Sequence, residues 1–294
     1  MKRSIFTLVA SVLLLGLSWV VPHSPFKVEV QIPTPTLVPS GGAVSIALPT
    51  PDSASAQGGI QVSYQNVSLV IPAGLASGAD SEIGAAIEAP DGYYTASNAP
   101  AFTRVILKDY PVLSSDDFYK PEVRIYPAAE YTAMSLWAAE TLKRLQNVLA
   151  NPSSPLENDI LPNVAFMGSA AQNYAAQVKI LPFQNGNGVR MISHYAQYPA
   201  PISQNESFYH YEGLTQDGKY YVVVEMPLIL PIYSDGNNPG ENGITYPADR
   251  NNPAEMVAYY KSMTNLLNSA GQETFKPTLA QLDALVQSII VTTK

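Results

Sequence analysis

The chain has 294 residues, of which 46% are hydrophobic and only 14% charged, enough apolar side chains to bury a substantial core. Sixteen Lys and Arg against 24 Asp and Glu give a formal net charge of -8, which repels phosphate backbones, so nucleic acid is not an expected partner. The absence of cysteine excludes disulfides, thiolate zinc sites, iron-sulfur clusters and cysteine nucleophiles.

The N-terminus has the pattern of an export signal. Lys2 and Arg3 precede an uncharged apolar run over residues 5–21. This run just reaches the length of a membrane span, and no small-x-small cleavage site follows it closely. We therefore expect residues 1–21 to be either a cleaved signal peptide or an uncleaved membrane anchor. In both cases the rest of the chain is extracytoplasmic and meets the membrane only through this segment.

Residues 22–58 are rich in Pro, Ser and Thr. Proline stiffens a segment and removes backbone donors, so this stretch is predicted to be a disordered, extended spacer. A globular domain is predicted over residues 59–294.

Alternating apolar residues begin at Ile60. Residues 60–65 and 67–72 are predicted to form a hairpin around Asn66, and residues 102–110 and 122–131 to supply further strands. A helix ending at Asn151-Pro152 should follow, because apolar residues recur at intervals of three and four. Its predicted buried stripe comprises Met134, Trp137, Ala138, Leu142, Leu145 and Leu149.

The middle of the chain has the clearest turn signals. Residues 178–183 and 189–198 flank the Asn-Gly-Asn-Gly stretch at 185–188, which predicts one hairpin. Residues 208–215 and 219–226 flank Asp217-Gly218 and predict a second.

Two helices are predicted at the C-terminal end. Asn252 is the expected N-cap of the first, with Pro253 at its first position and Gly271 at its end. Thr278 and Gln281 form an expected capping box at the start of the last helix. Its predicted buried face comprises Leu279, Leu282, Leu285, Val286 and Ile289.

Strands in runs, with helices grouped after them, indicate an α+β fold: an antiparallel β-sheet of several hairpins packed against helices in a single domain. The order of a starting hairpin, a helix, consecutive hairpins and a terminal helix resembles the Mog1/PsbP-like sandwich. That resemblance concerns topology alone.

The second hairpin carries the first candidate site. A two-residue turn at 217–218 places His210 opposite Glu225 and Glu212 opposite Val223, whereas a three-residue loop with a bulge would shift this register. A histidine between two carboxylates can bind a divalent metal or act as a general base. Alternating polar residues on antiparallel strands more often face water, and a solvated face is the expectation here.

His194 precedes this hairpin, with Arg190 and Ile192 on its side of the strand. It would join His210 in one site only if both hairpins present these residues to the same pocket. No HExxH spacing or third close ligand supports such a metal site.

A partial calcium-loop pattern occupies residues 235–243, where Asp235, Asn237 and Glu241 are the candidate ligands. Pro239 and Tyr246 stand at positions that must supply ligands, so the EF-hand pattern fails and a plain polar loop is expected.

No motif in the chain indicates a cofactor. There is no GxSxG elbow and no phosphate-binding GxxxxGK[ST] loop, and Met191 stands where a GxGxxG pattern would need its third glycine. The 18 tyrosines could form a sugar-stacking surface, although most should be core and sheet residues, and Trp137 is expected in the core.

Residues 185–231 resemble the central segment of an uncharacterised group of bacterial exported proteins and lipoproteins. In that group a Tyr-Ala-Gln and Pro-Ile stretch precedes Gly-Leu-Thr-x-Asp-Gly-Lys-Tyr-Tyr, and the similarity extends to residues 71–76 and 277–289 here. Leu17-Ser18-Trp19 lies where a lipobox cysteine would be expected, so a lipid anchor is not implied. The resemblance implies export and supplies no catalytic residue.

The sequence therefore predicts an exported, envelope-associated domain that is not an enzyme and binds a protein or a small ligand. One alternative is a metal-assisted hydrolase that uses His194, His210, Glu212 and Glu225. Another is a carbohydrate-binding module with exposed, coplanar tyrosines. If the polar face of the hairpin is solvated, replacing His210 or Glu225 should leave stability nearly unchanged.

Overall fold

The computed structural model describes residues 58–88, 98–112, 120–152, 156, 158, 160–162, 170–230 and 242–292. The predicted export segment, all but the last residue of the predicted spacer, and the loop with Asp235, Asn237 and Glu241 lie outside these ranges. The described residues belong to one folded unit. None of the helices among them is long and apolar enough to cross a bilayer.

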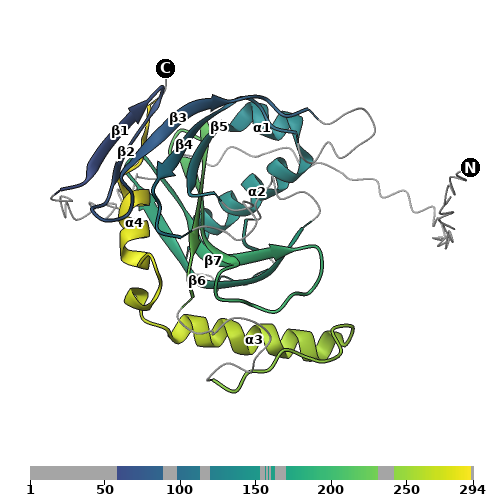
Figure 1. The fold of residues 1–294 in the computed structure, drawn as a ribbon. Coiled ribbons are helices and arrows are strands. Elements are labelled where there is room, and N and C mark those ends of the chain that lie inside the picture. The colour runs from purple at the N-terminus through teal and green to yellow at the C-terminus, as the bar shows by residue number, and fades with distance from the viewer. Residues whose placement is uncertain are drawn as a thin grey trace, which may run out of the picture. The chain divides into compact units, whose positions relative to one another are not determined.

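A seven-stranded antiparallel sheet forms the centre of this unit, with strand order β3-β4-β5-β9-β8-β7-β6. Its strands, in that order, are Gly78–Gly84, Phe102–Lys108, Glu122–Pro127, Tyr220–Leu228, Ser207–Thr215, Gly186–Ala196 and Ala171–Phe183. The β6-β7 and β8-β9 pairs are the two predicted hairpins, and they lie side by side in the sheet (Figure 1).

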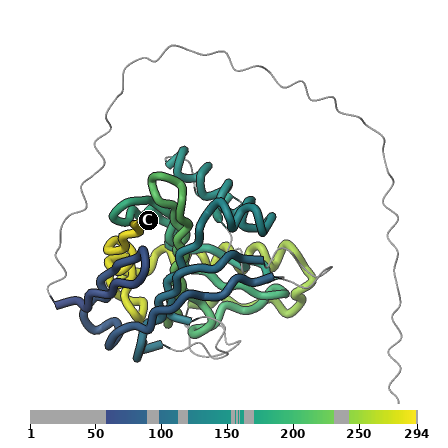
Figure 2. The backbone as a smooth tube through the Cα atoms, turned by 90° about the horizontal axis from the view of Figure 1, so that it is seen from above, coloured from purple at the N-terminus to yellow at the C-terminus, as the bar shows by residue number. Residues whose placement is uncertain are grey.

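A second, three-stranded sheet joins the two ends of the described chain. Its strands are β1 (Ile60–Tyr64), β2 (Val67–Ile71) and β10 (Ile290–Val291), and β2 is central. The predicted hairpin around Asn66 is confirmed, since Tyr64 pairs with Val67. Figure 2 shows this hairpin, in purple, beside the yellow C-terminal helix.

Helices cover both faces of the large sheet. They are α1 (Ala128–Met134), α2 (Leu136–Ala150), α3 (Pro253–Ser269) and α4 (Leu279–Gln287), with a short 3-10 turn, η2 (Gln272–Thr274), before α4. Val222 and Val224 of β9 pack in one core with α3, α4 and the small sheet, whereas Tyr221 and Val223 pack in another with α1 and α2. These two sides are called the α3/α4 face and the α2 face (Figure 1). The predicted α+β class is confirmed.

The predicted N-terminal caps of the last two α-helices are confirmed, whereas α3 ends at Ser269 with Ala270, not Gly271, as its C-cap. The Asn252 side chain accepts hydrogen bonds from the amides of Ala254 and Glu255, at 3.2 and 3.4 Å, and Pro253 is the first residue of α3. Thr278 and Gln281 form the capping box of α4. The predicted buried face of α4, Leu279, Leu282, Leu285, Val286 and Ile289, is fully buried.

The first helical region differs from the prediction. The strand at residues 122–131 ends at Pro127, and α1 begins at Ala128. Ser135 is extended and caps a separate helix, α2, so the apolar stripe does not continue through the break. Trp137, expected in the core, is therefore 39% exposed, and Val148 is buried instead.

The turn of the β6-β7 hairpin also lies elsewhere than predicted. Phe183 pairs with Gly186, so the turn is 184–185 and the glycines lie inside β7. A Cβ at Gly188 would lie 2.3 Å from the carbonyl oxygen of Glu212 and 2.5 Å from the ring of Tyr211. Gly188 is needed because it lets the buried Tyr211 ring lie against the backbone, not because the chain turns there.

Candidate functional sites on the two faces of the sheet

The predicted register of the β8-β9 hairpin is confirmed. His210 pairs with Glu225 and Glu212 pairs with Val223. Alternation places all three polar side chains on the α2 face, in line with Val223.

The expectation that this face is solvated is wrong. His210 and Glu212 are 0% exposed and Glu225 is 1% exposed, because β8 and β9 are central strands with α2 packed against β8. Replacing His210 or Glu225 should therefore change stability, since a buried polar group that loses its partner costs about 1–3 kcal/mol.

The structure separates His194 from the other three candidates. Met191 of β7 pairs with His210, so residues 191 and 193 share its face, whereas Ile192 and His194 point to the α3/α4 face. His194 approaches Asn173 instead, with 3.3 Å between its Nδ1 and the Asn173 Nδ2. No group of three or more His, Asp or Glu in the described ranges has a geometry that could hold a metal ion.

His210 and Glu212 form a buried pair with a tyrosine. The His210 Nε2 lies 3.0 Å from Glu212 Oε1, and the Tyr221 hydroxyl donates a 2.6 Å hydrogen bond to Glu212 Oε2. The imidazole ring lies against the rings of Phe208 and Tyr195. Aromatic packing thus fixes the ring beside a carboxylate.

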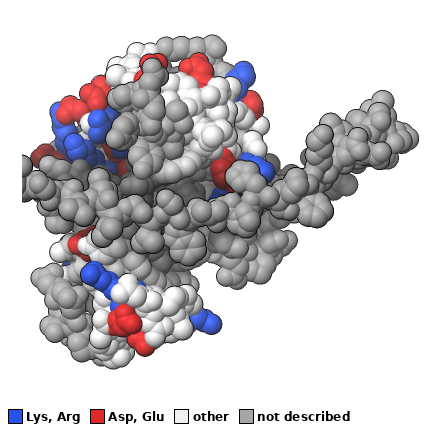
Figure 3. Space-filling model, turned by 90° about the vertical axis from the view of Figure 1, so that its right-hand side faces the viewer, with Lys and Arg blue, Asp and Glu red and all other residues white. Residues whose placement is uncertain are grey.

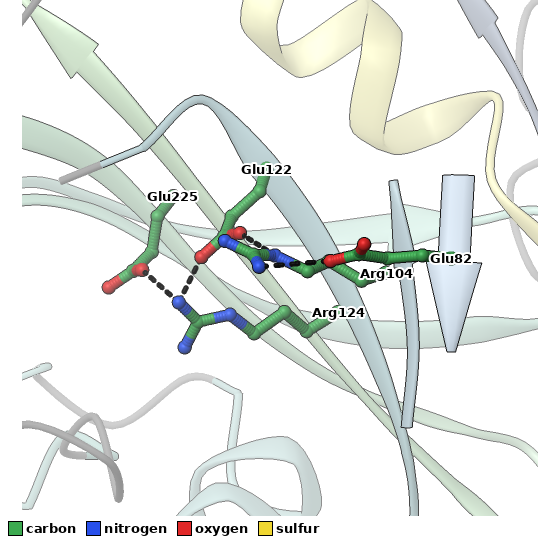
Figure 4. A network of polar contacts seen from close by, with 5 residues as sticks. All are labelled: Glu82, Arg104, Glu122, Arg124 and Glu225. Carbon is green, nitrogen blue, oxygen red and sulfur yellow. Dashed lines mark hydrogen bonds and ion pairs between the residues drawn. The ribbon is translucent and has the colours of Figure 1, made fainter. Parts of the chain in front are cut away.

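A chain of ion pairs continues across the α2 face toward β3 (Figure 4). Arg104 contacts Glu82 at 3.1 Å and also pairs with Glu122. Arg124 pairs closely with Glu122 and lies 3.7 Å from Glu225. The strand register brings these residues together, because Arg104 lies directly opposite Glu82 and Arg124, and Glu122 lies directly opposite Glu225.

Glu225 has the weakest contacts of the residues in this row of ion pairs. Neither of its carboxylate oxygens accepts a hydrogen bond from the described residues. Burial raises the pKa of Glu225 to about 8, Arg124 opposes that rise, and the nearby Glu122 and Glu212 add to it. Glu225 therefore holds a proton at neutral pH, beside Glu122, which pairs with Arg104 and Arg124.

A different feature lies at the β6 edge of the sheet, a groove between β6 and α3, whose lining includes Ala175 and Val178 from the α2 face as well as residues of the α3/α4 face. The β6-α3 groove has a volume of about 1080 Å³. Its walls include Asn173, Gln177, Lys179 and Arg190 from the sheet. They also include Tyr260, Lys261, Thr264, Asn265 and Asn268 from α3, and Gln272 from η2. The buried acids of the α2 face do not line it.

A bulge in β6 shapes this groove. The register of β6 against β7 shifts between Ala176 and Lys179, and Gln177 has a φ of 54°. From this position the Gln177 amide donates to the carbonyl oxygens of Leu267 and Ala270, at 2.8 and 3.1 Å. These carbonyls lie at the end of α3, where helices lack internal partners, so the bulge holds α3 against β6.

Arg190 lies at the buried side of the groove. It is 1% exposed, and its Nε lies 3.3 Å from Asp283 Oδ1 of α4. Lys179 and the Tyr209 hydroxyl share that carboxylate, at 3.6 and 3.0 Å. The Nε and Nη1 of Arg190 have no hydrogen-bond acceptor among the described residues.

Sequence reasoning did not find the groove. One signal for it was present, because Val257, Tyr260, Lys261, Thr264, Asn265 and Asn268 recur at helical spacing and all line it. The bulge left no comparable signal, because nothing in the residues around Gln177 marks an irregular strand.

Comparison with known proteins yields no relative. No family model, no curated protein and no solved structure matches this chain.

Proposed function

We propose that this chain is an exported, non-catalytic domain that binds a small polar ligand in the β6-α3 groove. The observation that carries the proposal is the groove itself. Pockets for small ligands usually enclose about 300–1,000 Å³ and present a few polar groups that fix orientation. The groove is of this size, at about 1080 Å³, and side-chain amides and a threonine hydroxyl line it.

The placement of the acidic residues supports binding rather than catalysis. Glu122, Glu212 and Glu225 are buried on the α2 face, and the fourth buried carboxylate among the described residues, Asp283, is held by Arg190, Lys179 and Tyr209. The groove lies beside β6 and α3 and none of them lines it. A hydrolase built from His194 with the other three candidates would need them in one pocket, and His194 lies on the opposite face.

The tyrosines do not favour a stacking surface for polysaccharide. Of the tyrosines described, only Tyr198 is predominantly exposed, at 59%. Tyr260 contributes one half-buried ring to the groove. A single ring suits a small ligand better than an extended chain of sugars.

Export remains part of the proposal on sequence grounds. The apolar run at residues 5–21 and the proline-rich spacer would place the groove outside the cytoplasm, at the envelope. The ligand is then one that the domain meets in the envelope.

Filling the groove tests the proposal. Thr264→Trp places a large ring in the groove, and Ser262→Trp places the same ring on the exposed side of α3 as the control. The melting temperature of the full-length protein in mild detergent is measured with six probes: galactose, galacturonate, glutamine, glutamate, glucose and glucose 6-phosphate. At roughly ten times its Kd, a bound probe should raise the melting temperature by about 3–6 °C.

We expect at least one probe to stabilise the wild type and Ser262→Trp, and to lose its effect in Thr264→Trp. A flat response to all six probes, or a shift that persists in Thr264→Trp, would contradict binding in the groove.

A further inference from the structure

We propose that the ligand of the β6-α3 groove carries a pair of anionic oxygens, as a carboxylate or a phosphate presents them, and that Arg190 receives this group. The inference rests on the proposed function, because it names the chemical class of ligand for the same groove.

The charges at the groove are the first argument. The protein carries a formal net charge of -8. The groove nevertheless has Lys179, Arg190 and Lys261 in its wall, and no Asp or Glu among the described residues that line it. On the face shown in Figure 3 cationic and anionic side chains are interspersed, so the cationic lining is a local feature.

The buried guanidinium is the second, independent argument. Removing hydrogen-bond donors from water without giving them acceptors is costly, and more so for a charged group. Arg190 is 1% exposed, its Nε faces Asp283 at 3.3 Å, and its Nη1 lacks an acceptor among the described residues while its side chain borders the groove. A planar guanidinium with an unpaired donor suits an oxygen of a carboxylate or phosphate.

Asp283 does not neutralise this corner of the groove. Its one carboxylate faces both Arg190 and Lys179, at 3.3 and 3.6 Å, and also accepts from Tyr209. Two cations and one carboxylate leave one positive charge, and Lys261 adds another from α3. Asp283 instead positions Arg190, holding its Nε side against α4.

The neutral lining defines the remainder of the ligand. Asn173, Asn265 and Gln272 offer amides, and Thr264 offers a hydroxyl. These groups suit hydroxyl or amide substituents on the ligand, beside an apolar wall of Leu156, Ala175, Val178 and Val257.

Three matched pairs of probes test the inference by titration calorimetry on the full-length protein. Galacturonate and galactose, glutamate and glutamine, and glucose 6-phosphate and glucose differ mainly in the anionic group. We expect the acid of at least one pair to bind at least tenfold more tightly than its neutral partner, with an affinity that falls as salt rises. Binding by glucose 6-phosphate alone would assign the subsite to phosphate, and binding by galacturonate or glutamate alone would assign it to carboxylate.

Substitutions in the groove test where the anionic group of the ligand binds. Lys261→Gln, at an exposed position, should weaken binding of the acidic probe about twofold to fivefold. Lys143→Gln on α2 should not change the affinity for this probe. Arg190→Gln combined with Asp283→Asn removes both buried charges together and should weaken binding of the acidic probe at least about thirtyfold. If the double variant does not fold, Lys261→Gln alone still tests whether the anion binds in the groove.

The two proposals fail differently. Neutral probes that bind as tightly as their acids, with binding lost in Thr264→Trp, would overturn the anion subsite and leave the groove as a binding site. Acid binding that neither Thr264→Trp nor Lys261→Gln changes, or no binding in any pair, would overturn both.

Discussion

At the scale of single residues, Glu225 shows how burial changes the chemistry of a carboxyl group. It lies on a central strand, 1% exposed, without a hydrogen-bond donor among the described residues and 3.7 Å from the Arg124 guanidinium. Burial raises the pKa of Glu225, and the Arg124 guanidinium, which lies closer to Glu122, only partly opposes that rise. Protonation of Glu225 removes one negative charge from the buried face that Glu225 shares with Glu122 and Glu212.

This protonation makes the stability of the protein depend on pH. The folded chain keeps the proton on Glu225 up to about pH 8, whereas the unfolded chain releases it near the ordinary value of 4.5. Between these values the folded state binds one more proton, so the free energy of unfolding falls as pH rises, by roughly 1.4 kcal/mol per pH unit at most. Below pH 4.5 the stabilisation from this proton is fully present, and above about pH 8 it is lost.

Urea unfolding at pH 5.5 and pH 7.5 checks this for the wild type, Glu225→Gln and the exposed control Glu140→Gln. We expect the wild type and Glu140→Gln to lose stability between the two pH values, and Glu225→Gln to lose clearly less. Equal pH slopes in Glu225→Gln and the wild type would show that Glu225 does not hold the proton.

At the scale of elements, local signals predicted the caps and hairpins, and tertiary packing decided the rest. Asn252 and Thr278 cap their helices through contacts within four residues, which a sequence displays directly. Alternation along β8 and β9 predicted which residues share a face. It could not show that α2 covers the polar face, because a buried polar face and a solvated one alternate in the same way.

The bulge at Gln177 is the element-scale device that builds the groove, and it yields a prediction. Gln177→Ala removes the amide that donates to Leu267 and Ala270, so amide hydrogen exchange in the last turn of α3 should become faster. The loss of these hydrogen bonds should cost about 1–2 kcal/mol.

Gln184→Ala is the matched control, because the Gln184 amide donates to the carbonyl oxygen of Gln287 at the end of α4 instead. It should accelerate exchange at the end of α4 and leave α3 unchanged. Unchanged exchange at the end of α3 in Gln177→Ala would mean that the bulge does not hold this helix.

At the scale of the whole molecule, the large sheet separates two polar sites. The α2 face holds buried ion pairs, with Glu122 paired to two arginines, and it also leaves both Glu225 oxygens without a hydrogen bond from the described residues. The α3/α4 face leaves donors of Arg190 without acceptors beside an open groove. Sequence reasoning singled out His210, Glu212 and Glu225 on the first face but missed the acids and arginines around them. It also missed the groove, because the groove joins residues from β6, β7 and α3 that are distant in the chain.

Native mass spectrometry of the full-length protein, after incubation with galacturonate, glutamate and glucose 6-phosphate, tests the central claim most directly. We predict a bound species of small mass on the wild type and on Ser262→Trp that is missing from Thr264→Trp, with a negative charge when released. The same bound species on Thr264→Trp, or none on the wild type, would contradict the claim that the β6-α3 groove is a ligand site.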